Sequence, residues 1–120
     1  AHITGGGIAG NLARVLPAGV EAYIDLDAWT PPAIFGEIAR RGPVAEDEMF
    51  KVFNMGIGFV AVVAADNEAA ALAAVLGAIK IGDVVAGENR IELIPQRPMK
   101  KMRGFLKGID TDVPREDDRV

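Results

Sequence analysis

The chain has 120 residues, 50% hydrophobic and 25% charged, a balance typical of one folded domain with a single core. The absence of cysteine excludes disulfides and thiolate metal sites, and the single histidine excludes a metal site built from several histidines. Residues 1–94 carry six basic and twelve acidic side chains, which argues against a nucleic-acid surface there.

The apolar runs and the start of the chain give further signals. No apolar run reaches the roughly 20 residues that a membrane-spanning helix needs, and no signal-peptide pattern is present, so we expect a soluble, cytoplasmic protein without membrane contact. The chain starts at Ala1 without methionine, in what we interpret as the end of a strand, which favours a piece of a longer polypeptide.

The first predicted elements are a strand end, a turn and a short helix. Ala1–Thr4 is predicted as the strand end and Gly5–Gly7 as the tight turn. Helical spacing of apolar residues predicts a helix over residues 8–16, ended by Pro17. The residues of its apolar face are Ile8, Leu12 and Val15.

A half-buried strand follows, and after it a helix whose start and end are both marked by typical residues. Residues 20–27 alternate strictly, with Val20, Ala22, Ile24 and Leu26 on one face and Glu21, Tyr23, Asp25 and Asp27 on the solvent face. The next helix is predicted to have Thr30 as N-cap, Pro31 in its first turn and Gly42 as a left-handed end. Its buried stripe is Ile34, Phe35 and Ile38.

The middle of the chain predicts one more helix and a buried strand. Residues 44–53 form the helix, with three acidic residues in a first turn where they favour the helix dipole. Two glycines then make a bend, and the uninterrupted apolar run Ile57–Ala64 is typical of a strand covered on both faces.

The last elements complete the fold prediction. Asp66 can cap an alanine-rich helix ending at Gly77, and two strands are expected around Ala78–Val85 and Arg90–Pro95. The order predicts an α/β or α+β sandwich, with helices packed on a mixed sheet. Residues 96–120 lose periodicity and predict a charged tail that is extended or disordered.

The glycine loop has two physical interpretations. Gly5, Gly7 and Gly10 spell G-x-G-x-x-G, and Asp25 or Asp27 lies where a dinucleotide fingerprint asks for an acidic residue. Glycines leading into a helix N-terminus can also bind another anion, or can make a plain structural turn. The short helix and the lack of repeated strand-helix-strand units weaken the dinucleotide interpretation, which stays open beside the structural turn.

Two motifs, "HITGGG" at residues 2–7 and "FNMGIG" at residues 53–58, carry a resemblance to a known family. Together with "AYIDLDAWTPPAIFGEIARRG", "IKIGDVVAG" and "RIEL", they resemble phosphoribosylformylglycinamidine cyclo-ligase, also called aminoimidazole ribonucleotide synthetase. The resemblance covers about residues 1–94. It implies that residues 1–95 are part of the C-terminal domain of this α+β fold, and it gives no counterpart for residues 96–120.

The resemblance also implies an activity. The family closes the imidazole ring of formylglycinamidine ribonucleotide with ATP, giving aminoimidazole ribonucleotide, ADP and phosphate. ATP and Mg²⁺ are bound largely by the family's N-terminal domain, which pairs into a homodimer, so we expect no cofactor or metal in this chain and no activity from it alone. Homodimer formation or other self-association is expected.

The family motif implies a set of site residues at the cleft. His2 is the candidate catalytic group that polarises or protonates the formyl oxygen. The candidate substrate- or phosphate-binding residues are Thr4, Gly5, Gly6, Gly7 and Asn54.

Each of these candidates has a structural alternative. His2 can be a strand-end histidine that makes only a hydrogen bond, and Asn54 can be a turn-forming residue. We interpret Trp29, Phe35, Phe50 and Phe53 as core or interdomain packing. A dinucleotide-binding domain and a non-catalytic assembly module remain as alternative functions. The basic segment Arg97–Lys107 is interpreted as a solubilising extension, with a phosphate-binding arm as the alternative.

Overall fold

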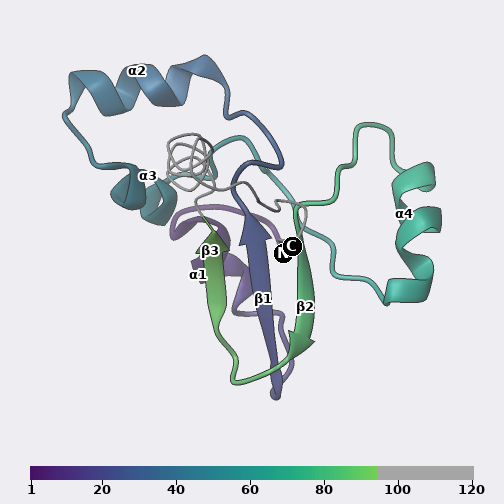
Figure 1. Ribbon diagram of the computed structural model, residues 1–120. Coiled ribbons are helices and arrows are strands. Elements are labelled where there is room, and N and C mark those ends of the chain that lie inside the picture. The colour runs from purple at the N-terminus through teal and green to yellow at the C-terminus, as the bar shows by residue number, and fades with distance from the viewer. Residues whose placement is uncertain (95–120) are drawn as a thin grey trace, which may run out of the picture.

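The computed structural model describes residues 1–94, in which a small mixed sheet is the central element (Figure 1). The strand order is β2-β1-β3. The central strand β1 (Val20–Asp25) pairs antiparallel with β2 (Gly82–Ala86) and parallel with β3 (Ile91–Ile94). The predicted tail at residues 96–120 lies outside the described residues.

Strand β1 follows its predicted alternation with one exception. Ala22, Ile24 and Leu26 are buried, as the period of two requires. Glu21, predicted on the solvent face, is only 6% exposed. The prediction was wrong there because the turn between β2 and β3 folds over this carboxylate, which accepts a hydrogen bond from the amide of Glu88.

Helix α1 (Gly7–Leu12) is shorter than the predicted residues 8–16. Ile8 and Leu12 are buried, but Val15 lies beyond the helix end and is 51% exposed. The amide of Val15 bonds to the carbonyl of Leu12, three residues back. This tightened last turn before Pro17 ends the helix early, because proline disfavours helical backbone in the residue before it.

Helix α2 (Ala33–Arg41) begins later than predicted, without a side-chain cap. The prolines that follow Thr30 hold the chain extended, so the helix starts only after Pro32 and Thr30 caps nothing. Gly42 ends the helix at φ −93°, not in the predicted left-handed conformation. Ile34 is 58% exposed, whereas Phe35 and Ile38, also of the predicted stripe, pack against the core.

Helix α3 (Glu46–Val52) has the predicted acidic first turn and buries Met49 and Phe50. It contacts α1 on one side and α2 on the other. The buried side chains of α1, α3 and β1 therefore form one core, which extends to both family motifs. Its members are Ile3, Ile8, Leu12, Ala22, Ile24, Leu26, Met49, Phe50, Met55 and Val60.

The predicted strands at Ala1–Thr4 and Ile57–Ala64 are wrong as regular strands. Only an isolated antiparallel bridge between His2 and Phe59 marks them. Phe59 is 71% exposed, and the run was predicted to be covered on both faces. An apolar run is buried as a strand only where neighbours lie on both sides of it, and within residues 1–94 only the first three residues pair with this run.

The last helix stands apart from the sheet (Figure 1). A 3₁₀ turn η1 (Ala65–Asn67) leads into α4 (Glu68–Ala74), which buries no residue. The helix ends before Gly77 because Val75 is already extended, and Asp66 makes no cap bond. The predicted strand at Ala78–Val85 begins only at Gly82. Helices with a three-strand mixed sheet nevertheless confirm the predicted α+β class.

Candidate functional site

The two motif segments lie side by side although about fifty residues separate them. The amide of Ile3 donates to the carbonyl of Gly58 at 2.9 Å. Ala1 and Val60 exchange two backbone bonds, of 2.7 and 2.8 Å. The start of the chain is therefore joined to the end of "FNMGIG" by a short antiparallel ladder.

The glycine loop follows directly from this ladder and packs on α3. Gly6 and Gly7 have φ of +102° and +71°, a backbone region that favours glycine. A Cβ on Gly7 would lie 1.9 Å from the carbonyl oxygen of Phe50. Gly7 is thus needed for close packing of the loop against α3, and its amide is bonded to the carbonyl of Thr4 at 3.0 Å.

Asn11 holds the loop in this shape from inside α1. Its side chain is 3% exposed, and its amide group donates to the carbonyls of Gly7 at 2.8 Å, Thr4 at 3.1 Å and Gly5 at 3.3 Å. Its carbonyl oxygen accepts from the Thr4 hydroxyl at 3.2 Å. Asn11 was not among the predicted site residues. The available signal was a polar residue beside Leu12 on an otherwise apolar helix face, where burial requires a bonding partner.

Asn54 shapes a tight turn beside the loop. Its side-chain oxygen accepts from the amide of Gly56 at 2.8 Å, and its carbonyl accepts from Ile57 at 3.1 Å. Met55 and Gly56 both have positive φ, of 55° and 101°. The turn-forming alternative for Asn54 is therefore what the local geometry supports.

Aromatic packing fixes this turn from the other side. The indole N–H of Trp29 donates to the carbonyl of Met55 at 2.9 Å, and its ring meets Phe50 edge-on with centroids 6.4 Å apart. A Cβ on Gly56 would lie 2.6 Å from the Cδ of Pro32. The predicted packing role of Trp29 and Phe50 is confirmed, and the same holds for the Phe35–Phe53 pair at 5.8 Å.

The candidate residues gather in one region but differ in what they offer. His2, Thr4, Gly5 and Gly6 are exposed, Gly7 is buried and Asn54 is half-buried. The amides of Gly5 and Gly6 donate no hydrogen bond within residues 1–94. The exposed region therefore presents an imidazole and two backbone amides, which suit the oxygens of a phosphate or carbonyl group, and a Thr4 hydroxyl whose hydrogen is bonded to Asn11.

Residues 1–94 contain no group of three or more histidine or carboxylate side chains placed to hold a metal ion. Residues 1–94 thus do not fit a magnesium site by themselves. None of their helices is long and apolar enough to cross a bilayer.

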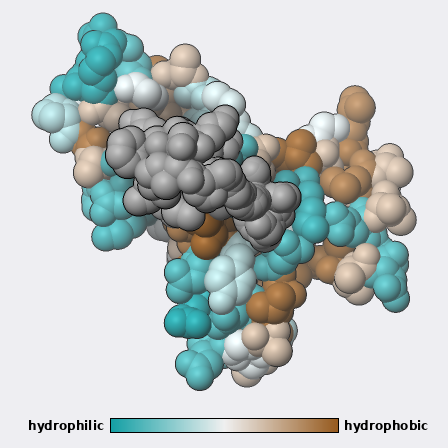
Figure 2. Space-filling view, viewed as in Figure 1, coloured by the Kyte–Doolittle hydropathy of each residue, from teal (hydrophilic) through white to brown (hydrophobic). Residues whose placement is uncertain are grey.

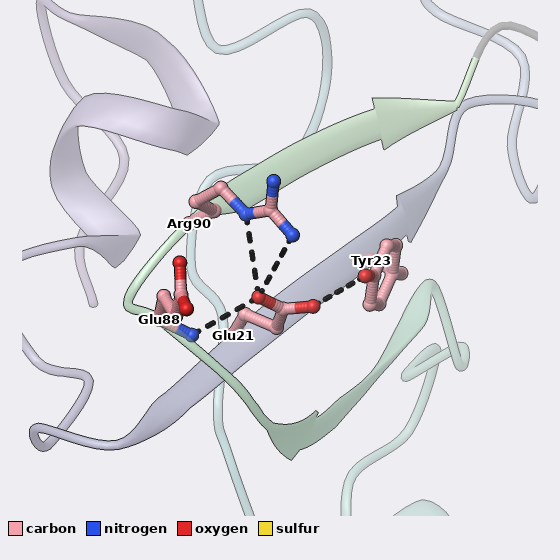
Figure 3. A network of polar contacts seen from close by, with 4 residues as sticks. All are labelled: Glu21, Tyr23, Glu88 and Arg90. Atoms are coloured by element: carbon pink, nitrogen blue, oxygen red, sulfur yellow. Dashed lines mark hydrogen bonds and ion pairs between the residues drawn. The ribbon is translucent and has the colours of Figure 1, made fainter.

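A separate polar cluster surrounds Glu21 on the sheet (Figure 3). Its carboxylate accepts from the Tyr23 hydroxyl, from the Glu88 amide at 3.1 Å and from the Arg90 guanidinium at 3.3 Å. The Tyr23 hydrogen bond, then the Glu88 amide and Arg90, lower the pKa of Glu21 below its ordinary value. The same contact with Glu21 raises the pKa of Tyr23. The bonds from Glu88 and Arg90 link β1 to the β2–β3 turn, and Tyr23 holds the carboxylate from within β1, so the cluster is structural.

Comparisons with known proteins agree with this arrangement. Residues 1–94 match the family model described as AIR synthase related protein, C-terminal domain. A relative in Anaeromyxobacter dehalogenans strain 2CP-1, named phosphoribosylformylglycinamidine cyclo-ligase, is 50% identical over 91 residues, covering 72% of this chain and 26% of the relative. A relative of the same name in Myxococcus xanthus is 49% identical over 93 residues, covering 74% and 27%.

A third relative of that name, in Thermodesulfovibrio yellowstonii, is 59% identical over 63 residues, 52% of this chain and 18% of the relative. The chain thus spans about a quarter of the length of the first curated relatives that it matches.

The alternative functions are not favoured. In a dinucleotide fold the strand before the glycine loop lies in the same parallel sheet as the next strand. Here residues 1–3 pair with residues 58–60, the neighbours of β1 are β2 and β3, and Asp25 accepts a hydrogen bond from the amide of Asp27. Fold, motif geometry and comparisons converge, and the chain belongs to the AIR synthase related protein family, whose C-terminal domain residues 1–94 match.

Proposed function

We propose that this chain is the C-terminal part of a phosphoribosylformylglycinamidine cyclo-ligase. Such an enzyme uses ATP to phosphorylate the formyl oxygen of formylglycinamidine ribonucleotide. The amidine nitrogen then attacks the activated carbon, phosphate leaves, and the products are aminoimidazole ribonucleotide, ADP and phosphate. The observation that carries the proposal is the backbone ladder that joins "HITGGG" to "FNMGIG", because it brings both motifs of the resemblance to one surface.

The proposed roles follow from what each group presents. The exposed His2 imidazole can donate to the formyl oxygen, because histidine is the side chain that most often transfers protons in catalysis. The amides of Gly5 and Gly6 can hold phosphate oxygens of the substrate, and the Thr4 hydroxyl can do so once it gives up its bond to Asn11. Gly7 serves this surface by packing, since its amide is already bonded to Thr4.

Asn54 keeps a narrower role in the proposal. Its side-chain oxygen is used by Gly56, so only its NH₂ group is offered to a substrate. Asn54 lies near the loop because a Cβ on Gly7 would be 3.4 Å from the carbonyl oxygen of the adjacent Phe53. We therefore propose Asn54 as a turn residue first and a substrate ligand second.

Cofactor, partner and location complete the proposal. ATP and Mg²⁺ would be held largely by the part of the enzyme that this chain does not span, since residues 1–94 do not fit a metal centre. A cytoplasmic location and a homodimer accord with a ligase of nucleotide synthesis. We also propose that the chain is inactive alone, because it corresponds to about a quarter of its relatives.

A chimera tests the proposal. Residues 1–94 replace the matching quarter of the Myxococcus xanthus relative, and turnover of formylglycinamidine ribonucleotide with ATP is measured. We expect an active chimera, and we expect His2→Ala to lower kcat by about 10²–10⁴-fold, the range for a general acid. The matched control is Arg14→Ala, an exposed substitution outside the loop. A folded but inactive chimera, or equal activity of His2→Ala and Arg14→Ala, would refute the proposal.

A further inference from the structure

Phe59 is the direct cross-strand neighbour of His2, the proposed proton donor. The two residues form an isolated antiparallel bridge. The residues next to them make its backbone hydrogen bonds, since the amides of Ile3 and Val60 donate across the bridge at 2.9 and 2.8 Å. His2 and Phe59 are therefore a non-hydrogen-bonded pair, in which the Cα atoms lie about 4.5 Å apart and the side chains come closest to each other.

Both side chains lie on the face of this ladder that points away from the core. Side chains alternate between the two faces of an extended chain. Ile3 and Val60, the next residues along each segment, are 2% and 8% exposed and belong to the core. His2 is exposed, and Phe59 is 71% exposed. A substrate that reaches the His2 imidazole therefore approaches the face that also carries the Phe59 ring.

Apolar exposure alone does not single out Phe59. Figure 2 shows further apolar surface over the α4 region, where Leu76 is fully exposed. What distinguishes Phe59 is its place directly opposite a candidate catalytic side chain. Its contact with His2 lies within one backbone ladder, so the contact does not depend on what else covers this surface.

The His2 imidazole has no polar partner to fix its orientation within the described part of the chain. Among residues 1–94 it takes part in no hydrogen bond or ion pair. A histidine that transfers protons needs a defined ring orientation, which a third group often supplies by hydrogen bonding. An aromatic ring beside the imidazole can supply this orientation by packing, and it leaves the ring nitrogens available to a substrate. Phe59 is placed for such packing.

We propose that Phe59 is a positioning residue for His2. Its ring packs against the imidazole and holds it in the orientation from which it donates to the formyl oxygen. Phe59 thus acts through His2 and contacts no reacting atom itself. This inference rests on the proposed role of His2 in ring closure.

Proton NMR of the full 120-residue chain tests the contact, because a single histidine makes the imidazole signals unambiguous. An aromatic ring shifts the signals of protons that lie close to it. At one fixed pH, we expect Phe59→Ala to move the two imidazole C–H signals and Phe59→Tyr to leave them near their wild-type positions. The control Val63→Ala, at an exposed apolar residue outside the pairing, should not move them. Unmoved signals in Phe59→Ala, or equal movement in Val63→Ala, would overturn the inference.

Kinetics of the chimera with the Myxococcus xanthus relative test the positioning. We expect Phe59→Ala to lower kcat at least about tenfold while KM for formylglycinamidine ribonucleotide stays within about twofold, because orientation is lost and substrate contacts are kept. Phe59→Tyr keeps the ring and should retain kcat. In the His2→Ala background, Phe59→Ala should lower kcat no further, because both changes act through one imidazole.

The same kinetics separate this inference from the proposed function. If His2→Ala lowers kcat and Phe59→Ala does not, only the inference is overturned. A higher KM with unchanged kcat would make Phe59 a substrate contact, and a full further loss in the His2→Ala background would give it a role independent of His2. Either result would overturn the inference. If His2→Ala leaves kcat unchanged, the proposed function is refuted and the inference falls with it.

Discussion

The body of the protein and the arm at residues 61–81 contain similar apolar residues but bury them very differently. In the body, comprising the sheet and helices α1 to α3, Ile8 and Leu12 are at most 1% exposed. In the arm, Val75 is 57% and Ile79 is 49% exposed, and α4 buries nothing. Apolar content therefore does not by itself make a core. A segment is buried only where another surface meets it.

The body achieves this contact through glycine and asparagine as much as through apolar side chains. Gly7 lets the loop reach the carbonyl of Phe50, and Asn11 satisfies three loop carbonyls from inside the core. Helix α4 packs on η1, and its described link to the sheet is the exposed Lys80, which forms ion pairs with Glu68 of α4 and Asp83 of β2. The site region is therefore well packed, whereas the arm is exposed.

The largest expected effect comes from Gly7, where the glycine loop makes its closest contact with α3. Gly7→Ala places a Cβ against a backbone oxygen at positive φ, so we expect it to lower the free energy of unfolding by more than about 4 kcal/mol or to prevent folding. Gly10→Ala, in open space within α1, should instead raise it by about 0.5–1 kcal/mol. Urea unfolding measures both. Equal effects of the two substitutions would show that the loop does not pack on α3.

The next effect compares leucines of the two regions directly. Leu12→Ala leaves a cavity in the core and should cost about 2–5 kcal/mol. Leu76→Ala removes an exposed side chain and should change stability by no more than about 0.5 kcal/mol. Urea unfolding makes the comparison. A cost for Leu76→Ala close to that of Leu12→Ala would mean that the arm is buried.

The smallest expected effect is the pH dependence of the stability that Glu21 contributes to the sheet. The folded pKa of Glu21 is depressed, so its contribution to stability is complete above the unfolded value of 4.5 and is lost as pH falls through the folded pKa. We expect the stability difference between the wild type and Glu21→Gln to shrink as pH falls below 4.5. Thermal unfolding between pH 3 and pH 7 measures it.

Glu37 provides a control for this pH effect, because its pKa is also lowered, by exposed hydrogen bonds to Arg41 and Arg40. Its contribution should fade with added salt, whereas that of the well-covered Glu21 should persist. A pH-independent difference for Glu21→Gln would contradict the role of the cluster.

The local patterns predicted much of the body and little of the arm. The alternation of β1, apart from Glu21, and the burial of Ile8 and Leu12 in α1 were predicted correctly, because each depends on residues close in sequence. Element ends were less predictable. Thr30 and Asp66 match cap preferences, yet neither caps its helix, because the backbone next to them sets where α2 and α4 begin. Gly42 ends α2 as predicted, but without the predicted left-handed conformation.

The candidate site, too, was predicted only in part. "HITGGG" and "FNMGIG" identified the region, and the exposure of His2, Thr4, Gly5 and Gly6 accords with their proposed roles. The packing role of Gly7 and the bonds of Asn11 could not be predicted, since both depend on contacts between segments. The catalytic and binding roles remain predictions that the chimera tests.

The sequence alone determined the family, the α+β class and the residue types of the loop, because these follow from motifs and periodicities along the chain. Only the tertiary structure decided that Gly7 is a packing residue, that Glu21 is covered, and that Phe59 is exposed. The physical reason is that burial and hydrogen bonding depend on which surfaces meet, and pattern within one segment does not specify its partner.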